Sequence, residues 1–306
     1  LLLIALLFWG RFAVQKRIVG RALSGFTELT PFKRGLTVFL LCAVLFGSGA
    51  VLFECQGVPF GGDEPHYLVI AQSLAEDGDF NVANQYYRHL YRKYLDVEEI
   101  GIHGYFGDSG QHEIFSFHLP GTALTITPLL WLVPPGMAVA AIRFLLALYA
   151  ALLMLVIYMC AWRLMNNSRS ALLTTLAMAV TSPVYFYSFH FYPEAQVMLL
   201  LLTSLYLRHL SPRREQVWAL AVSGLTLGLL LFWGVKYASL LYLYGIGALY
   251  GLIRQKNWRG ALIFAAGPLL MQGLFWSYLY SAYGNFSPAS VYQNELQKSQ
   301  FWGVIT

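Results

Sequence analysis

Two adjacent carboxylates are the strongest chemical signal in this chain. Asp63 and Glu64 occur in Gly-Gly-Asp-Glu-Pro-His, directly after an apolar run long enough to cross a bilayer. A carboxylate at a membrane surface can take the proton from an incoming hydroxyl, so Asp63 is a candidate general base. The ordinary alternative is that Asp63 caps the helix that begins at Pro65, and capping and catalysis are compatible because a cap fixes the direction of the carboxylate. Glu64 is expected to bind the acceptor or a cation, or to be solvated.

Two cations and a further acid lie near the predicted external ends of apolar segments. Arg143 and Lys236 suit the binding of a phosphate group, although side chains at such depth also snorkel to lipid headgroups without a further role. Glu194 follows Pro193 in another external turn. We expect it over the same cavity as Asp63, and stabilisation of a helix terminus is its ordinary role.

The predicted external histidines raise the question of a metal. His112 and His118 are six residues apart, whereas a zinc pair on one helix needs a spacing of four. Histidines among carboxylates can still hold a divalent ion, but solvated loop histidines are far commoner. We therefore expect no metal and no other cofactor, with a divalent ion as the alternative. The external histidines are His66, His89, His103, His112 and His118.

The composition indicates the elements that position these side chains. The chain is 58% hydrophobic and 11% charged, with a mean hydropathy of +0.55. Its apolar runs recur at about 20 residues, the length of a membrane-spanning helix, which predicts an all-α polytopic membrane protein. Within one such run, Gly224 and Gly228 predict close packing against another helix. The expected spans are 35–53, 138–162, 171–189, 195–208, 217–233, 237–253 and 261–283.

The placement of charge predicts the orientation. Basic residues fill the segment 1–34 and alternate later loops, which the positive-inside rule assigns to the cytoplasm. The segment 54–137 lies on the opposite side and holds eleven of the fifteen acidic residues. The net charge of +5 thus follows from topology, and nucleic acid is not an expected partner.

The long external segment has its own predicted structure. From Pro65, a helix of about 12 residues with one apolar face should lie on the membrane. A polar, tyrosine-rich loop with one short helix follows over 81–111, and then an apolar helix dips into the outer leaflet before 138. At the ends, Leu1–Trp9 resembles the tail of an earlier helix and 284–306 an external segment, so we expect a fragment of a longer protein.

Three motifs together resemble the C-type (GT-C) glycosyltransferases, especially the protein O-mannosyltransferase and aminoarabinose-transferase group. Asp63-Glu64 is similar to their acidic motif, and His118-Leu119-Pro120-Gly121 stands where they carry His-Pro-Pro-Leu or Lys-Pro-Pro-Leu. The segment Tyr280-Ser281-Ala282-Tyr283-Gly284-Asn285-Phe286 is similar to a tyrosine-rich Gly-Asn segment after a later span. The likeness is mainly topological and covers most of 35–300.

The resemblance implies a GT-C-like bundle in the inner cell membrane, with its active site on the external face. It further implies a polyprenyl-phosphate sugar as donor, an external lipid, glycan or protein as acceptor, and inversion at the anomeric carbon. His66, His118, Glu194 and Tyr283 would bind substrate. Two alternatives remain open, a non-catalytic subunit of a larger membrane complex and a transporter of lipid-linked saccharides. The transporter alternative predicts an inverted repeat, which the sequence does not display.

Overall fold

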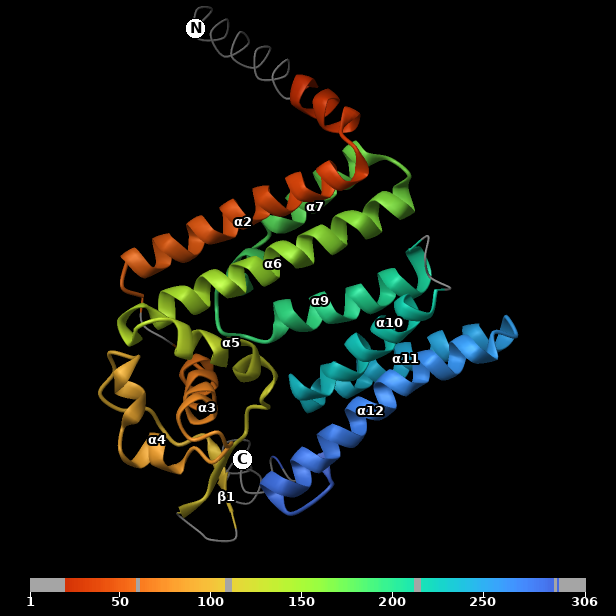
Figure 1. Cartoon of the computed structure of the whole chain (residues 1–306). Coiled ribbons are helices and arrows are strands. Elements are labelled where there is room, and N and C mark those ends of the chain that lie inside the picture. Colours follow the sequence, from red (N-terminus) through yellow and green to blue (C-terminus); the bar gives the residue numbers. More distant parts are fainter. Residues whose placement is uncertain (1–19, 59–60, 108–111, 212–215, 289–290, 292–306) are drawn as a thin grey trace, which may run out of the picture.

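The chain is mainly helical in a computed structural model that describes residues 20–58, 61–107, 112–211, 216–288 and 291 (Figure 1). The expected helix tail Leu1–Trp9 and most of the expected segment 284–306 lie outside these residues. The helices are α2 (Pro31–Cys55), α3 (Glu64–Glu76), α4 (Ala83–Tyr87), α5 (Gly121–Leu132), α6 (Pro135–Met165), α7 (Ser168–Ala179), α8 (Ser182–Tyr187), α9 (Glu194–Leu205), α10 (Val217–Leu229), α11 (Ala238–Arg254) and α12 (Trp258–Tyr283). Shorter turns are 3₁₀ at Leu90–Lys93, Leu230–Phe232 and Val235–Tyr237, and a π-helical turn at Tyr206–Leu210.

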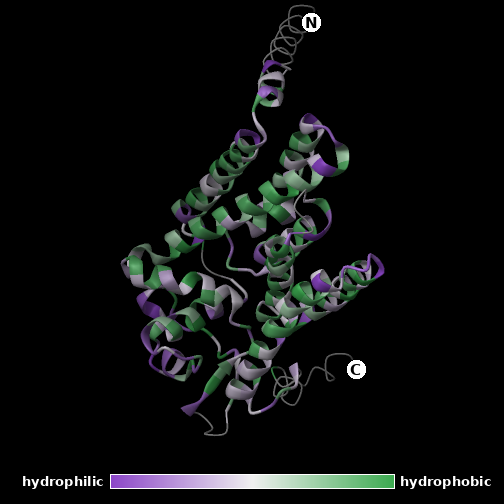
Figure 2. Ribbon diagram, turned by 45° about the vertical axis from the view of Figure 1, so that its right-hand side comes forward, coloured by the Kyte–Doolittle hydropathy of each residue, from purple (hydrophilic) through white to green (hydrophobic). Residues whose placement is uncertain are grey.

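Three of the described helices, α2, α6 and α12, are long and apolar enough to cross a membrane. They contain the expected spans 35–53, 138–162 and 261–283, and hydrophobic residues run along them in Figure 2. The other expected spans fall on shorter helices, so the total of seven remains a prediction. The expectation of one continuous helix over 171–189 is wrong, because α7 ends at Ala179 and α8 begins at Ser182 with Pro183 in its first turn.

Two helix pairs form much of the apolar interior. Along α2 and α6, Val38, Cys42 and Phe46 pack with Ala147, Ala151 and Met154 in one buried cluster. Gly224 and Gly228 of α10 lie against α12. A Cβ at Gly228 would stand 2.8 Å from the Cα of Pro268, and one at Gly224 would collide with the carbonyl oxygen of Phe264. The predicted close packing of this glycine pair is confirmed.

Replacement of Gly224 by alanine is expected to destabilise the protein by about 1 to 3 kcal/mol, because the added methyl group must push α10 and α12 apart. The measurement is thermal unfolding of the purified protein in one detergent. Gly247→Ala on α11 is the matched control, because no described atom lies within 4 Å of a Cβ at that position. Equal melting temperatures for the two variants would contradict the close approach of α10 and α12.

The helix α3 differs from the expected surface helix. It has the predicted start and length, and it ends at the predicted turn Glu76-Asp77-Gly78. All residues from Glu64 to Ser73 are buried, however, packed among α4, α5 and α6. Polar side chains of α3 are also buried. Gln72, for example, donates a hydrogen bond to the carbonyl oxygen of Leu90 at 3.0 Å. The prediction of a helix with one apolar face is therefore wrong, and α3 is the centre of a small packed domain (Figure 1).

A two-stranded antiparallel sheet, absent from our expectations, completes this domain. Strand β1 (Gly104–Phe106) pairs with β2 (Ile114–Ser116), with Gly104 opposite Ser116. A Cβ at Gly104 would lie 2.8 Å from the carbonyl oxygen of Phe115, so the pairing requires glycine there. The register continues one step beyond the strands, since the N–H of Phe117 donates to the carbonyl oxygen of His103 at 3.3 Å. This hairpin brings His103 and His118 to the same place.

Candidate functional site

Asp63 lines a polar cavity. It immediately precedes α3, and Gly62 with φ +58° allows the chain to turn into the helix. In the described part of the chain its side chain makes no capping hydrogen bond. The carboxylate is instead about half exposed and faces a cavity with about 740 Å³ of empty space. The side chain of Asp63 therefore does not act as a helix cap.

The cavity is lined by residues from both halves of the chain. The walls combine the start of α3, the ends of the hairpin, the turn before α9 and the turn after α10. Its lining residues include Asp63, Tyr67, His103, Phe117, His118, Leu119, Pro193, Trp233, Gly234 and Lys236. Of the predicted site residues, Asp63, His118 and Lys236 are brought together here.

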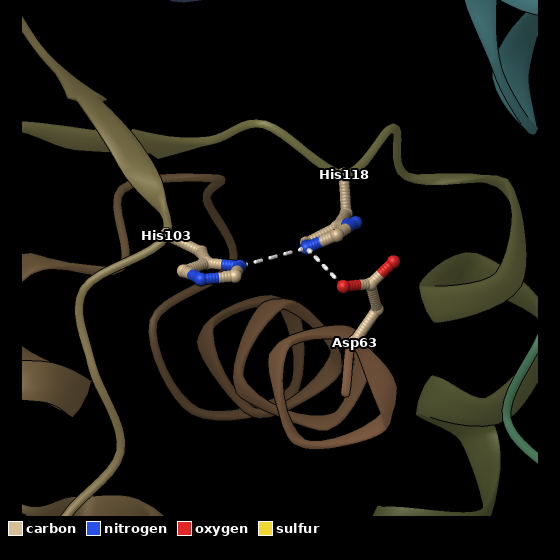
Figure 3. Close-up of side chains that lie close together, drawn as sticks. All are labelled: Asp63, His103 and His118. Atoms are coloured by element: carbon tan, nitrogen blue, oxygen red, sulfur yellow. Dashed lines mark hydrogen bonds and ion pairs between the residues drawn. The ribbon is translucent and has the colours of Figure 1, made fainter. Parts of the chain in front are cut away.

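Three histidine rings form a stack at the base of this cavity. His66 lies parallel to His103, with ring centroids 4.0 Å apart, and His118 stacks on the same group at 5.4 Å from His66. His118 also approaches Asp63, with 3.9 Å between Nε2 and Oδ1 (Figure 3). Burial, together with the charge of neighbouring histidines, lowers the pKa of His66 to about 3 and that of His118 to about 4. Both rings are therefore neutral at neutral pH.

His66 supports the cavity from behind instead of binding substrate directly. It is buried, and its Nδ1 lies 2.7 Å from the hydroxyl oxygen of Tyr86. It is not among the described residues that line the cavity. Its stacking holds the ring of His103, which we named only as one of several external histidines. No local signal in the sequence indicates that His103 belongs to the site, because the hairpin places it there.

Glu64 has a structural position that the sequence did not indicate. Its side chain is 4% exposed and accepts hydrogen bonds from Nδ1 of His190 and from the N–H of Phe191, both at 3.0 Å. Gly61 donates a third, at 3.3 Å. Burial alone would raise the pKa of Glu64, but the hydrogen bonds from His190 and Phe191 outweigh it and hold that pKa below its ordinary value. The expectation that Glu64 is solvated is wrong, and its expected binding of an acceptor or a cation is not supported at this cavity, because Glu64 is not among the described lining residues.

Lys236, another lining residue of the cavity, forms an ion pair with Glu194. The Nζ of Lys236 lies 3.2 Å from Oε1 of Glu194, and the Tyr237 hydroxyl donates to the same oxygen at 3.4 Å. Lys236 is well exposed and lines the cavity. Glu194 is the first residue of α9. It lines a neighbouring apolar cavity together with Tyr187 and Met198. Glu194 thus orients the lysine rather than facing the space above Asp63.

The structure does not bring Arg143 to this cavity. Its guanidinium is buried in α6, where Nη1 lies 2.8 Å from Oε2 of Glu54 and the group stacks over the ring of Phe53. Arg143 therefore joins the start of α6 to the end of α2. Since it is not among the described lining residues, its expected contact with the donor phosphate would need a rearrangement of this pair.

Tyr283 is likewise placed behind the site. Near the end of α12 it is buried, and its hydroxyl donates to the carbonyl oxygen of Ser116 at 2.7 Å. It also packs against the ring of Phe115. The expected direct contact of Tyr283 with a sugar is not supported by this position. The hydrogen bond instead anchors β2 two residues before His118.

Comparison with models of known protein families, with curated proteins and with solved structures gives no match to this chain. Its function must therefore be argued from the chemistry of the site. That site consists of a half-exposed carboxylate, two histidines and a lysine around one open cavity.

Proposed function

We propose that this chain is a membrane glycosyltransferase that moves a sugar from a polyprenyl phosphate to an external hydroxyl or amine. The observation that supports the proposal most is the half-exposed carboxylate of Asp63, unused by its helix, in a cavity that Lys236 also lines. A base and a cation around one cavity suit a displacement in which the acceptor loses a proton and an anion leaves.

The proposed reaction is a single displacement. The acceptor oxygen or nitrogen attacks the anomeric carbon and forms a new bond there, while the bond from that carbon to the phosphate oxygen breaks. The electron pair of the broken bond leaves on the phosphate, next to the ammonium of Lys236. The acceptor proton passes to the carboxylate of Asp63. Attack from the side opposite to the leaving group inverts the anomeric carbon.

An apolar cavity beside Lys236 fits the lipid part of such a donor. It has about 560 Å³ of empty space and is lined almost wholly by apolar side chains from α6, α8 and α9. Glu194 is the link between the two cavities, because it lines the apolar one and pairs with Lys236. A polyprenyl chain against this surface would place its phosphate at the lysine. The lining residues are Ala150, Leu153, Pro183, Val184, Tyr187, Glu194, Ala195 and Met198.

Purified full chain in vesicles, given a panel of synthetic polyprenyl-phosphate hexoses and pentoses, tests the proposal through the release of polyprenyl phosphate. Enzymatic release of polyprenyl phosphate from at least one donor is expected. No release from any donor would contradict the proposal. Movement of donor across the vesicle membrane without release would favour a transporter instead.

Replacement of Lys236 by methionine is expected to raise the KM for the active donor roughly 10- to 100-fold, because a hydrogen bond to a charged group contributes about 1.5 to 3 kcal/mol. Methionine keeps much of the side-chain length and removes only the charge. Lys33→Met, at an exposed lysine in the first turn of α2, is the matched control and should leave the KM unchanged. An unchanged KM in Lys236→Met would exclude this lysine from donor binding.

A further inference from the structure

We infer that Asp63, His103 and His118 form a binding site for a divalent transition-metal ion of the zinc class. Each side chain offers one ligand atom, and the three atoms lie within 4.8 Å of one another (Figure 3). This inference does not rest on the proposed glycosyl transfer, since binding of the ion alone can be measured. It revises our expectation from the sequence that no metal is bound.

The distances between the ligand atoms fit an ion at their centre. Nδ1 of His103 lies 3.4 Å from Nε2 of His118, which lies 3.9 Å from Oδ1 of Asp63. Ligands of a tetrahedral zinc ion, with bonds of about 2.0 to 2.1 Å, stand about 3.4 Å from one another. One edge of the triangle already has this length. A small rotation of the half-exposed Asp63 side chain would bring the carboxylate to the same distance.

The same distances show that direct contacts hold the three side chains together only loosely. The two imidazole nitrogens, 3.4 Å apart, make one long hydrogen bond, and the 3.9 Å between Nε2 of His118 and Oδ1 of Asp63 exceeds the usual range of about 2.7 to 3.2 Å for a nitrogen–oxygen hydrogen bond. Three ligand atoms that face one another at longer distances leave a central space. Two imidazoles favour zinc, cobalt, nickel or copper over magnesium and calcium, which prefer oxygen ligands.

The positions of the ligands are fixed by the surrounding fold. His103 and His118 flank the two strands of the hairpin, whose register holds them side by side. The buried His66 stacks on His103 from behind, and the Tyr86 hydroxyl fixes His66 in turn. Asp63 comes from a separate segment at the start of α3. Such support by outer residues orients metal ligands and strengthens binding.

Three protein ligands leave a coordination position open towards the cavity. Zinc sites that bind water or substrate have this arrangement, whereas purely structural sites have four protein ligands. Because all three ligands line the cavity, the ion would bind an oxygen ligand from that space. The ion would also supply a positive charge that Arg143, buried against Glu54, does not bring to the cavity.

Binding of Co²⁺ and Zn²⁺ to the chelator-treated full chain in detergent tests the site. Co²⁺ is expected to give a visible absorption band that one equivalent of Zn²⁺ abolishes and excess Mg²⁺ does not. His103→Ala should weaken Zn²⁺ binding by at least about 100-fold, since it removes a ligand. His112→Ala is the matched control, because His112 is an exposed histidine of the same external segment outside the cluster. It should bind Zn²⁺ as the unmodified chain does.

Asp63→Ala provides a second variant if His103→Ala fails to fold, because among the described residues the Asp63 side chain makes no capping hydrogen bond and it is about half exposed. It should also lose Zn²⁺ affinity. Binding that is equal in the unmodified chain, His103→Ala and Asp63→Ala would overturn the inference, as would loss of binding in His112→Ala alone. Zinc binding in a chain that transfers no sugar would leave the metal site standing and remove only the proposed function.

Discussion

Replacement of Asp63 by asparagine is expected to reduce sugar transfer by about 10²- to 10⁴-fold while the amount of folded protein stays the same. Asparagine has the same shape but no basic oxygen, so it cannot accept the proton of the attacking hydroxyl. The fold should tolerate the change, because the Asp63 side chain makes no capping hydrogen bond in the described structure and is about half exposed. The measurement is polyprenyl phosphate release, normalised to monodisperse protein.

Asp96→Asn is the matched control, since Asp96 is an exposed aspartate in the same segment between α2 and α5. It should transfer sugar as the unmodified chain does. Because Asp63 is also a proposed metal ligand, the unmodified chain is measured in parallel after treatment with a chelator. Activity that survives the chelator but not the substitution assigns proton transfer to Asp63. Full activity in Asp63→Asn would exclude Asp63 as the base.

The sequence predicted the parts of the site that depend on local features. Asp63 and Lys236 lie near the ends of apolar segments, and such positions are readable from hydropathy and charge alone. His118 was found through a motif next to a helix start. The lengths of α2, α6 and α12 follow from the same apolar runs, because a continuous helix satisfies its own backbone without help from distant residues.

The wrong predictions concern side chains whose position depends on residues far away in the sequence. Glu64 looked free because its partner, His190, lies more than a hundred positions away in the chain. Arg143 likewise meets Glu54, and Tyr283 meets Ser116, across separate elements. Neither the composition of the chain nor the spacing of its residues indicates which distant side chains form such contacts. The burial of α3 was missed for the same reason, since its polar face is covered by a loop that the pattern described only as tyrosine-rich.

The hairpin explains why the sequence did not predict that His103 belongs to the site. Its strands have three residues each, too few for an alternating pattern to be distinctive. The register depends on the fit of Gly104 against Phe115, which is a tertiary contact. A short sheet of this kind nevertheless places one wall of the cavity and two of the proposed metal ligands.

Replacement of Glu64 by alanine is expected to lower the free energy of unfolding by about 2 to 5 kcal/mol, because each buried donor that loses its hydrogen-bond acceptor costs about 1 to 3 kcal/mol. The change leaves the imidazole of His190 and the N–H of Phe191 buried without their acceptor. Exposed carboxylates contribute far less. Glu98→Ala, at an exposed position of the same segment, is the matched control and should change stability by less than about 0.5 kcal/mol.

The pH dependence of this effect follows from the lowered pKa of Glu64. A carboxylate whose pKa is lower in the folded than in the unfolded state stabilises the fold above its unfolded pKa, about 4.3. That contribution is lost as the pH falls through the folded pKa. The melting temperature of the unmodified chain should therefore fall below about pH 4.3 more steeply than that of Glu64→Ala. Parallel curves would contradict an ionised, hydrogen-bonded Glu64.

Substitution of Glu64 should affect catalysis as well as stability, which distinguishes Glu64 from a residue that only stabilises the fold. Glu64 is the next residue after Asp63, and its carboxylate fixes the loop that leads through Phe191 to Glu194, the partner of Lys236. One buried side chain thus ties the segment that carries the proposed base to the segment that leads to the partner of the proposed phosphate-binding cation, and we expect it to affect their spacing. Glu64→Gln keeps one acceptor oxygen and should fold better than Glu64→Ala. At a temperature where Glu64→Gln is fully folded, this variant should still show a reduced kcat. An unchanged kcat at that temperature would show that Glu64 has no effect on this spacing.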